Sequence, residues 1–367
     1  MADYSARNER IKHQYFEYLK EAMRYSDDTV DKVSKALARF EAFTEWRDFA
    51  GFRADHAVAF KKDLARQRGR QSKKPLSKST LHGTLSDLRR FFHWLAGQPG
   101  YKSKLNYSDS DYFNLSEKES RVARAKRETP IPTLEQVRHA VTNMPNESET
   151  ERRDQAVIAW TILTGMRDGA TASLKLRHVD VHTRRVYQDA REVRTKFSKS
   201  FTSYFFPVGG PFEQIVANWI TYLRERKRWG LDDPLFPATK VVNGHTHAFT
   251  PCGVKPEPWQ SANPIRTIFK RAFEAVDMPY FNPHSFRNTL VRLGEQVCNS
   301  PEEFKAWSQN LGHEKVMTTF NSYGEVPSSR QGSIMESLQR SSSRDSQDKA
   351  RLRNFFEAWL ESEMESF

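Results

Sequence analysis

The chain has 367 residues, of which 37% are hydrophobic and 28% charged, and its formal net charge is +12. This length allows two ordinary domains, and so basic a balance favours a polyanionic partner, nucleic acid before membrane. We expect no membrane span, because no stretch approaches the roughly 18 apolar residues that one needs. A signal peptide is not expected either, because the chain begins with polar and charged residues. The cysteines, Cys252 and Cys298, are expected to be reduced, as in a cytoplasmic protein.

The first hundred residues predict helices. Apolar residues recur at helical spacing over 30–40 and 81–95, and residues 57–67 predict a shorter helix. Such stripes form cores far more often than binding sites, so we expect a helical domain over 1–105.

The loop before residue 77 and the helix after it are strongly basic. A solvated surface is the simpler interpretation, but Lys and Arg side chains also displace the counterions that condense on DNA. The candidates for phosphate contact are Arg66, Arg68, Arg70, Lys73, Lys74, Arg89 and Arg90.

Residues 106–131 predict an inter-domain linker, because periodic apolar residues are few and the stretch runs into a Pro-Ile-Pro breaker. Its basic residues are expected to lie along a DNA backbone. They are Arg121, Arg124, Lys126 and Arg127. A second domain, over 132–326, then begins at Thr133 with a capping-box helix start.

The second domain predicts helices around a small antiparallel sheet, with a buried helix over 156–164. The predicted strands are 179–187, 192–196 and 201–207, and later helices are 212–228 and 265–276. Residues 230–264, rich in proline, glycine and histidine, predict a long loop. A metal site at His245, His247 and Cys252 is disfavoured, because no second cysteine or carboxylate stands at ligand spacing.

Polar residues suited to phosphodiester chemistry stand in short motifs along this domain. They are Arg167 in LTGMRDGA, His284 and Arg287 in PHSFR, His313 in LGHEK and Tyr323 in NSYGEV. Guanidinium groups hold phosphate oxygens, imidazoles move protons near neutral pH, and a phenol can act as a covalent nucleophile. Together they can hold and attack a phosphodiester without a metal.

This order of motifs resembles that of the tyrosine recombinase (phage integrase) family, over about residues 130–325. The family pattern is Arg, Lys on a β-hairpin, His-x-x-Arg, Leu-Gly-His and Tyr. The hairpin lysine would be Lys196 in Arg-Thr-Lys, with Lys199 as its rival and otherwise a DNA contact. The resemblance implies a mainly α protein with a small antiparallel β-sheet in its C-terminal domain. A helical core-binding domain would precede a mixed α/β catalytic domain.

The resemblance also implies a role for each of these residues. The two arginines would hold the scissile phosphate, and the hairpin lysine would protonate the leaving 5′ oxygen. The histidines would assist proton transfer, and the tyrosine would form a 3′-phosphotyrosyl link. No metal, nucleotide or other cofactor is implied.

Two positions depart from the family pattern. The family usually has Glu or Asp three residues after the first arginine, where this chain has Ala170. Asp168 lies one residue after Arg167 and would point elsewhere on a helix. From His313 to Tyr323 is ten residues (323 − 313), one more than the commonest family spacing. The insertion would re-aim the phenol unless the local turn absorbs it.

The last part of the chain, 327–367, predicts a flexible polar stretch followed by an amphipathic helix. The apolar side chains of this helix are Leu352, Phe355, Phe356, Trp359 and Leu360. Packing on its own domain is one interpretation. Our prediction is that the helix docks in trans on the next catalytic domain of a closed ring.

The function that the resemblance implies is that of a site-specific DNA recombinase or integrase of a mobile element, acting on DNA in the bacterial cytoplasm. It would bind double-stranded DNA as a homotetramer on two sites. Accessory DNA-bending or directionality factors would be further possible partners. One alternative is a type IB topoisomerase-like enzyme, which would use the same residues as a monomer. The other is a DNA-binding accessory protein that has lost cleavage, as Ala170 suggests.

Overall fold

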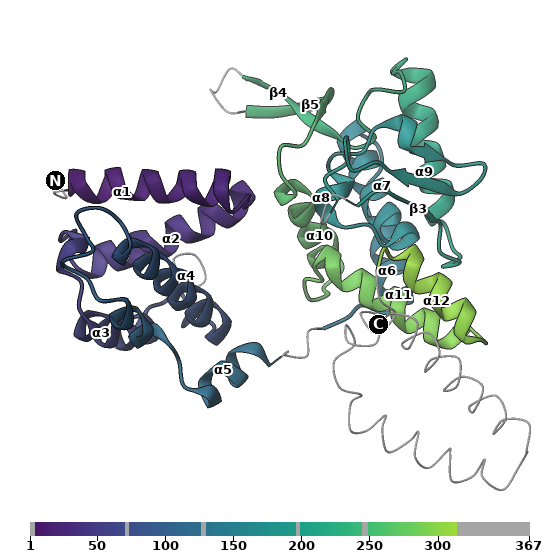
Figure 1. The fold of residues 1–367 in the computed structure, drawn as a ribbon. Coiled ribbons are helices and arrows are strands. Elements are labelled where there is room, and N and C mark those ends of the chain that lie inside the picture. Colours follow the sequence, from purple (N-terminus) through teal and green to yellow (C-terminus); the bar gives the residue numbers. More distant parts are fainter. Residues whose placement is uncertain (1–3, 70–72, 126–129, 196–198, 244–248, 314–367) are drawn as a thin grey trace, which may run out of the picture. The chain divides into compact units, whose positions relative to one another are not determined.

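The structure is a computed structural model that describes residues 4–69, 73–125, 130–195, 199–243 and 249–313 (Figure 1). The chain divides into two compact units, Met1–Arg127 and Glu128–Phe367, and each has a hydrophobic core of its own. Among the described residues, no helix is long and apolar enough to cross a lipid bilayer.

The first unit is helical, as predicted. Its helices are α1 (Ala6–Glu17), α2 (Asp27–Phe43), α3 (Ala54–Arg66), α4 (Lys78–Ala96) and α5 (Glu117–Arg124), with a π-helical turn at Tyr18–Ala22 and 3-10 turns at Phe49–Gly51 and Tyr107–Phe113. The apolar stripes of α2 and α4 meet in the core, where the rings of Phe40 and Phe92 lie 5.1 Å apart, edge to face. Ser77 caps α4 by accepting a hydrogen bond from the Thr80 amide.

Much of the segment expected to be a linker is helical. Phe113, in the 3-10 turn, is fully buried in the core of the first unit. Ser116 starts α5 with a capping box: its hydroxyl accepts from the Glu119 amide, and the Glu119 carboxylate accepts from the Ser116 amide. The chain passes to the second unit after Arg127, within the stretch 106–131.

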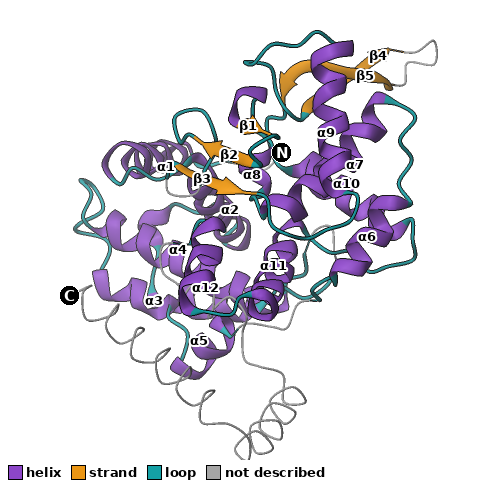
Figure 2. Ribbon diagram, turned by 90° about the vertical axis from the view of Figure 1, so that its right-hand side faces the viewer, coloured by secondary structure: helices purple, strands orange, loops and turns teal. Residues whose placement is uncertain are grey.

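The second unit is a set of helices with two small antiparallel sheets (Figure 2). Its helices are α6 (Leu134–Thr142), α7 (Glu149–Thr164), α8 (Asp168–Thr171), α9 (Phe212–Thr221) with a π-helical turn at Tyr222–Arg226, α10 (Asn263–Glu274), α11 (Pro283–Val297) and α12 (Pro301–Asn310). One sheet holds β1 (Val179–Asp180), β2 (Arg185–Gln188) and β3 (Phe201–Tyr204), in that order. Most of α7 is buried, and its Trp160 is a fully buried core side chain.

The prediction of a strand over 192–196 is wrong for its described part. Residues 192–195 lie in a loop between β2 and β3, where the amides of Glu192 and Val193 both donate to the Asp189 carbonyl, at 3.0 and 2.7 Å. These turn hydrogen bonds use backbone groups that a strand ladder would need, so β2 pairs with β3 instead.

The prediction of a long loop over 230–264 is also wrong. This stretch contains a hairpin of β4 (Pro237–Asn243) and β5 (Phe249–Pro258). Its root is held by α7: the Arg153 guanidinium donates to the Pro237 carbonyl at 3.0 Å, and the Glu149 carboxylate accepts from the Val254 amide at 2.9 Å. Proline and glycine lower the local preference for a strand, so these tertiary contacts decide the outcome.

Candidate active site

Arg167 follows the end of the buried helix α7. The helix ends at Gly165, whose backbone is left-handed with φ 59°. A Cβ at Gly165 would lie 2.7 Å from Leu311 Cδ2 and 2.9 Å from Leu290 Cδ1, so the turn can pack this closely only with glycine. Arg167 then occupies the N-cap position of α8 and is half-buried.

Arg287 lies on α11 and is only 4% exposed. Its guanidinium donates to the Gly165 carbonyl, to the Leu311 carbonyl at 2.6 Å and to His313 Nε2 at 2.9 Å. These contacts use three of the five N–H groups of an arginine. Arg287 thereby joins the end of α7, which leads to Arg167, to the end of α12, which leads to His313.

His313 follows α12 through a tight turn. Gly312 has a φ of 70°, and a Cβ there would lie 2.6 Å from Phe201 Cζ of β3. The His313 amide donates to the Ser308 carbonyl at 3.2 Å. Because a guanidinium can only donate, His313 Nε2 accepts the hydrogen bond from Arg287, and the neutral imidazole carries its proton on Nδ1.

Burial, and for two groups neighbouring positive charge, lower the pKa values of the basic residues of this site. Burial lowers the pKa of Arg167. Burial, and then the charge of Arg167, lower the pKa of Arg287 to about 9. Burial first, and then Arg287, Arg167 and His284, lower the pKa of His313 to about 4. At neutral pH both arginines are charged and His313 is neutral, so the site attracts an anion.

The carboxylate expected from the family pattern has no substitute among the described residues of the site. Ala170 is buried, and Asp168 Oδ2 accepts a hydrogen bond from Arg266 Nε at 2.8 Å. No aspartate or glutamate is found among the described residues that line the small cavity beside Arg167 and Arg287. The contacts of Arg287 are instead made with neutral groups, the carbonyls of Gly165 and Leu311 and the imidazole of His313.

The small cavity has a volume of about 20 Å³, enough for roughly one water molecule. Besides the two arginines, its lining includes Thr195, Lys199 and Asn310. Sequence reasoning missed Thr195 as a site residue, because a threonine beside a candidate lysine has no pattern of its own.

The structure describes only some of the remaining predicted catalytic residues. His284 is exposed on the first turn of α11, three positions before Arg287. Lys196 and Tyr323 lie outside the described residues. Lys199 lines the small cavity, so the rival lysine stands beside the two arginines.

The structure describes most of the predicted DNA contacts of the first unit. Arg66, Arg68, Lys73 and Lys74 lie at the end of α3 and in the loop after it, while Arg70, Lys126 and Arg127 lie outside the described residues. Three others pair with carboxylates: Arg89 with Asp111 at 2.8 Å, Arg90 with Asp87 at 2.5 Å, and Arg121 with Glu117. Arg124 is exposed at the end of α5.

A second basic surface in the first unit was missed. It lines a cavity of about 520 Å³ between α2 and α4. Its basic side chains are Lys32, Lys35, Arg39 and His82. Sequence reasoning missed Lys32, Lys35 and Arg39 because they are spaced along the helix and form no run of charge.

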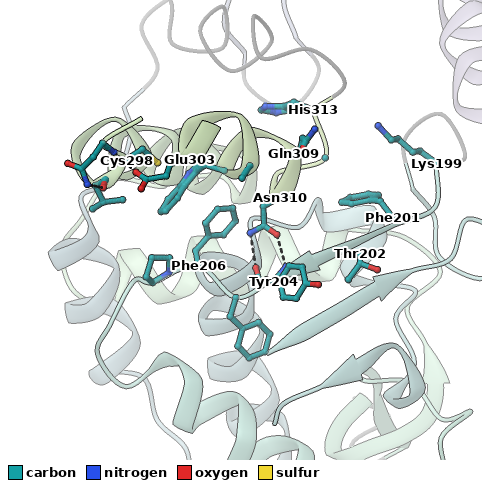
Figure 3. Close-up of a pocket in the computed structure, with 17 residues that line it drawn as sticks. Lys199, Phe201, Thr202, Tyr204, Phe206, Cys298, Glu303, Gln309, Asn310 and His313 are labelled. Atoms are coloured by element: carbon teal, nitrogen blue, oxygen red, sulfur yellow. Dashed lines mark hydrogen bonds between the residues drawn. The ribbon is translucent and has the colours of Figure 1, made fainter. Parts of the chain in front are cut away.

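A larger groove, of about 820 Å³, lies beside the active-site turn (Figure 3). It is bounded by β3, the end of α11 and α12, and its lining includes Phe201, Phe206 and Trp307. Asn310 braces it by bonding both backbone groups of Tyr204, with its Oδ1 accepting from the amide at 2.6 Å and its Nδ2 donating to the carbonyl at 2.9 Å. His313 lies at the edge of this groove.

A helical unit followed by a mixed α/β unit, with two arginines and a histidine around one anion site, defines the tyrosine recombinase fold class. The profile of the phage integrase family matches residues 133–330, and that of the phage integrase N-terminal SAM-like domain matches residues 13–98. The chain therefore belongs to the phage integrase family of tyrosine recombinases. The matched ranges include all the predicted catalytic residues, Tyr323 among them.

Solved structures with the same fold share little sequence with this chain. A lambda integrase dimer bound to a COC′ core site is 14% identical with a TM-score of 0.58, over 88% of this chain and 78% of that one. The Tn1549 transposon integrase in complex with transposon right end DNA is 15% identical with a TM-score of 0.56, over 90% and 99%. The XerH site-specific recombinase bound to a palindromic difH substrate is 15% identical with a TM-score of 0.56, over 89% and 85%. A search of curated protein sequences finds no match.

Proposed function

We propose that this protein is a site-specific DNA recombinase that cleaves and rejoins duplex DNA through a 3′-phosphotyrosyl intermediate. The observation that carries the proposal is that Arg167 and Arg287 line one small cavity and that Arg287 donates to His313. These are the residue types that the family uses to hold the scissile phosphate. The DNA-bound relatives of the same fold support duplex DNA as the substrate.

In the proposed reaction, Arg167 and Arg287 hold the non-bridging oxygens of the phosphate and stabilise the charge of the pentacoordinate state. The Tyr323 hydroxyl attacks phosphorus and passes its proton to His284 or to water, and the bond from phosphorus to the 5′ oxygen breaks. Lys196 supplies the proton that the leaving 5′ oxygen takes up. The reverse sequence rejoins the strand, because the phosphotyrosyl bond conserves the energy of the phosphodiester.

His284 and His313 assist this proton transfer and hydrogen-bond the phosphate. His313 is neutral at neutral pH, because its pKa is lowered to about 4, and its Nδ1–H is the group that can donate to a phosphate oxygen. A bound phosphate would add a negative charge beside the imidazole and raise this pKa.

The basic surfaces of the first unit are proposed to hold the flanking duplex. The α3 loop with Arg66, Arg68, Lys73 and Lys74 has exposed cations for phosphate oxygens. The α2–α4 surface adds a cavity lined by Lys35, Arg39 and His82, where Lys32 pairs with Asp87 at 3.1 Å. Arg89, Arg90 and Arg121 are weaker candidates, because each already pairs with a carboxylate.

The assembly is proposed to be a homotetramer on two DNA sites, in which the tail helix of one subunit docks on the next. The groove of Figure 3 is a suitable acceptor, because it is lined largely by apolar and aromatic side chains. The polar stretch predicted after Tyr323, some twenty residues long, would have a root-mean-square reach of about 25 Å as a random coil. Deleting residues 345–367 should spare binding to one half-site and weaken assembly on paired sites. A truncated monomer that melts much earlier would show that the helix packs in cis.

Trapping on a nicked suicide duplex tests the proposal directly. The wild type should form a protease-sensitive adduct at a 3′ phosphate, and Tyr323→Phe should bind the same DNA without forming it. An adduct in the Phe variant would refute the assignment of the nucleophile. A wild type that binds DNA without cleaving it would favour the accessory-protein alternative. The missing carboxylate at Ala170 is the observation that favours this alternative. Relaxation of supercoils without strand exchange between two duplexes would favour the topoisomerase alternative.

The biological role that we propose is the integration or excision of a mobile element in a bacterial cytoplasm.

A further inference from the structure

Thr195 presents a hydroxyl without a partner at the centre of the site. Among the described residues, its Oγ1 is buried and makes no hydrogen bond. Burying a hydroxyl in this way is unfavourable unless a ligand or a water molecule supplies the missing partner. Thr195 lines the small cavity together with Arg167 and Arg287.

The size and charge of the cavity define what that partner can be. Its volume of about 20 Å³ admits one atom of oxygen size, as the room needed for a single water shows. Two charged guanidinium groups line it, and no carboxylate does among the described lining residues. A single anionic oxygen satisfies both the charge of the arginines and the hydroxyl donor.

The backbone before Thr195 is held firmly. The Thr195 amide donates to the Val193 carbonyl at 2.7 Å, and the Arg194 amide donates to Ser173 Oγ at 2.9 Å. The Arg194 guanidinium donates to the carbonyls of Trp259 at 2.5 Å and Gln260 at 2.8 Å. Because these contacts fix the backbone, the Thr195 hydroxyl needs little reorganisation when a ligand binds.

We propose that Thr195 is a further catalytic residue, whose hydroxyl donates a hydrogen bond to a non-bridging oxygen of the scissile phosphate between Arg167 and Arg287. The inference rests on the proposed function, since it concerns the same phosphate. The hydroxyl keeps its proton throughout, while the phosphorus–oxygen bonds change at Tyr323 and at the 5′ oxygen. It assists by stabilising charge on one oxygen.

Two substitutions at this position and one elsewhere separate this role from packing. Thr195→Val keeps the shape and removes the hydroxyl, so adduct formation in single turnover should slow about 10- to 100-fold with little change in DNA affinity. Thr195→Ser keeps the hydroxyl and should retain most of the rate. Thr171→Val is the matched control: Thr171 Oγ1 is likewise buried without a hydrogen bond among the described residues, but Thr171 does not line the cavity. It should cleave at the wild-type rate.

Methylphosphonate substrates test the contact itself. Replacing one non-bridging oxygen by methyl gives two diastereomers, and the loss caused by Thr195→Val should vanish on the diastereomer that lacks the contacted oxygen and persist on the other. Equal losses on both diastereomers, or a wild-type rate for Thr195→Val on normal DNA, would overturn the inference and leave water as the partner of the hydroxyl. If the wild type itself forms no adduct on normal DNA, the proposed function fails, and this inference with it.

Discussion

Replacing Arg287 by lysine should damage both catalysis and folding. In the structure the guanidinium reaches the carbonyls of Gly165 and Leu311 and the ring of His313, and it also lines the cavity proposed to hold the phosphate. A lysine ammonium keeps the charge but is a single point, without the planar fork that reaches several acceptors at once. Arg287→Lys therefore cannot hold both turns and the phosphate together.

The size of each effect follows from these contacts. Losing one preorganised donor to the transition state costs about 10²- to 10³-fold in rate. An ammonium in this position can reach one of the two buried carbonyls, and leaving the other unsatisfied costs about 1–3 kcal/mol of the free energy of unfolding. DNA affinity should change little, because the proposed DNA contacts include many other cations.

Single-turnover adduct formation on a suicide duplex measures the rate, and urea unfolding measures stability. Arg184→Lys is a suitable control, since Arg184 has a largely exposed side chain and pairs only with Glu213 among the described residues. It should match the wild type in both assays. An Arg287→Lys variant that cleaves at the wild-type rate would place Arg287 outside the phosphate clamp, and one of unchanged stability would show that its carbonyl contacts contribute nothing.

Three further predictions follow from the same site. Lys196→Ala should slow cleavage of a normal 5′ oxygen far more than cleavage of a 5′-bridging phosphorothiolate, whose sulfur leaves without a proton; equal losses would turn attention to Lys199. Gly312→Ala should be clearly less stable than Gly209→Ala in thermal unfolding, because both have positive φ but only Gly312 has a close neighbour, Phe201 Cζ at 2.6 Å from an added Cβ; equal melting temperatures would contradict the contact. The pKa of His313 is lowered to about 4 in the folded protein, against about 6.5 in the unfolded chain. As the pH falls, the unfolded chain therefore takes up this proton before the folded protein does. Stability should therefore fall as pH drops from about 6.5 to 4, by up to about 3 kcal/mol, and a His313→Gln variant should lose that much less in urea titrations across the same window.

The sequence predicted the helical first unit well, because its apolar stripes have one clear period and each packs into one core. Residues 81–95 lie within α4, and the Ser77 cap stands where the sequence indicates a helix start. The ordered motifs also led to the right family. Their geometry follows from local rules: a left-handed glycine ends α7, and a second one turns the chain after α12.

The hairpin of β4 and β5 could not be predicted, since the information that forms it is not local. Its strands contain proline and glycine, and its root depends on Glu149 and Arg153, some ninety residues earlier in the chain. Thr195 was missed for a similar reason. A threonine beside a candidate lysine has no pattern of its own, and only burial and the cavity distinguish it.

The absent carboxylate at position 170 gains a physical meaning from these contacts. A carboxylate beside the first arginine would orient it and also neutralise part of its charge. Here the neighbouring arginine, Arg287, is oriented by the carbonyls of Gly165 and Leu311, which are dipoles and leave its full charge in place. Burial, and then the charge of Arg167, lower the pKa of Arg287. In the proposed reaction the scissile phosphate would supply the counter-charge to both guanidinium groups. Ala170 is thus compatible with an active enzyme, because the arginine clamp can be ordered by neutral groups and remain fully positive for its substrate.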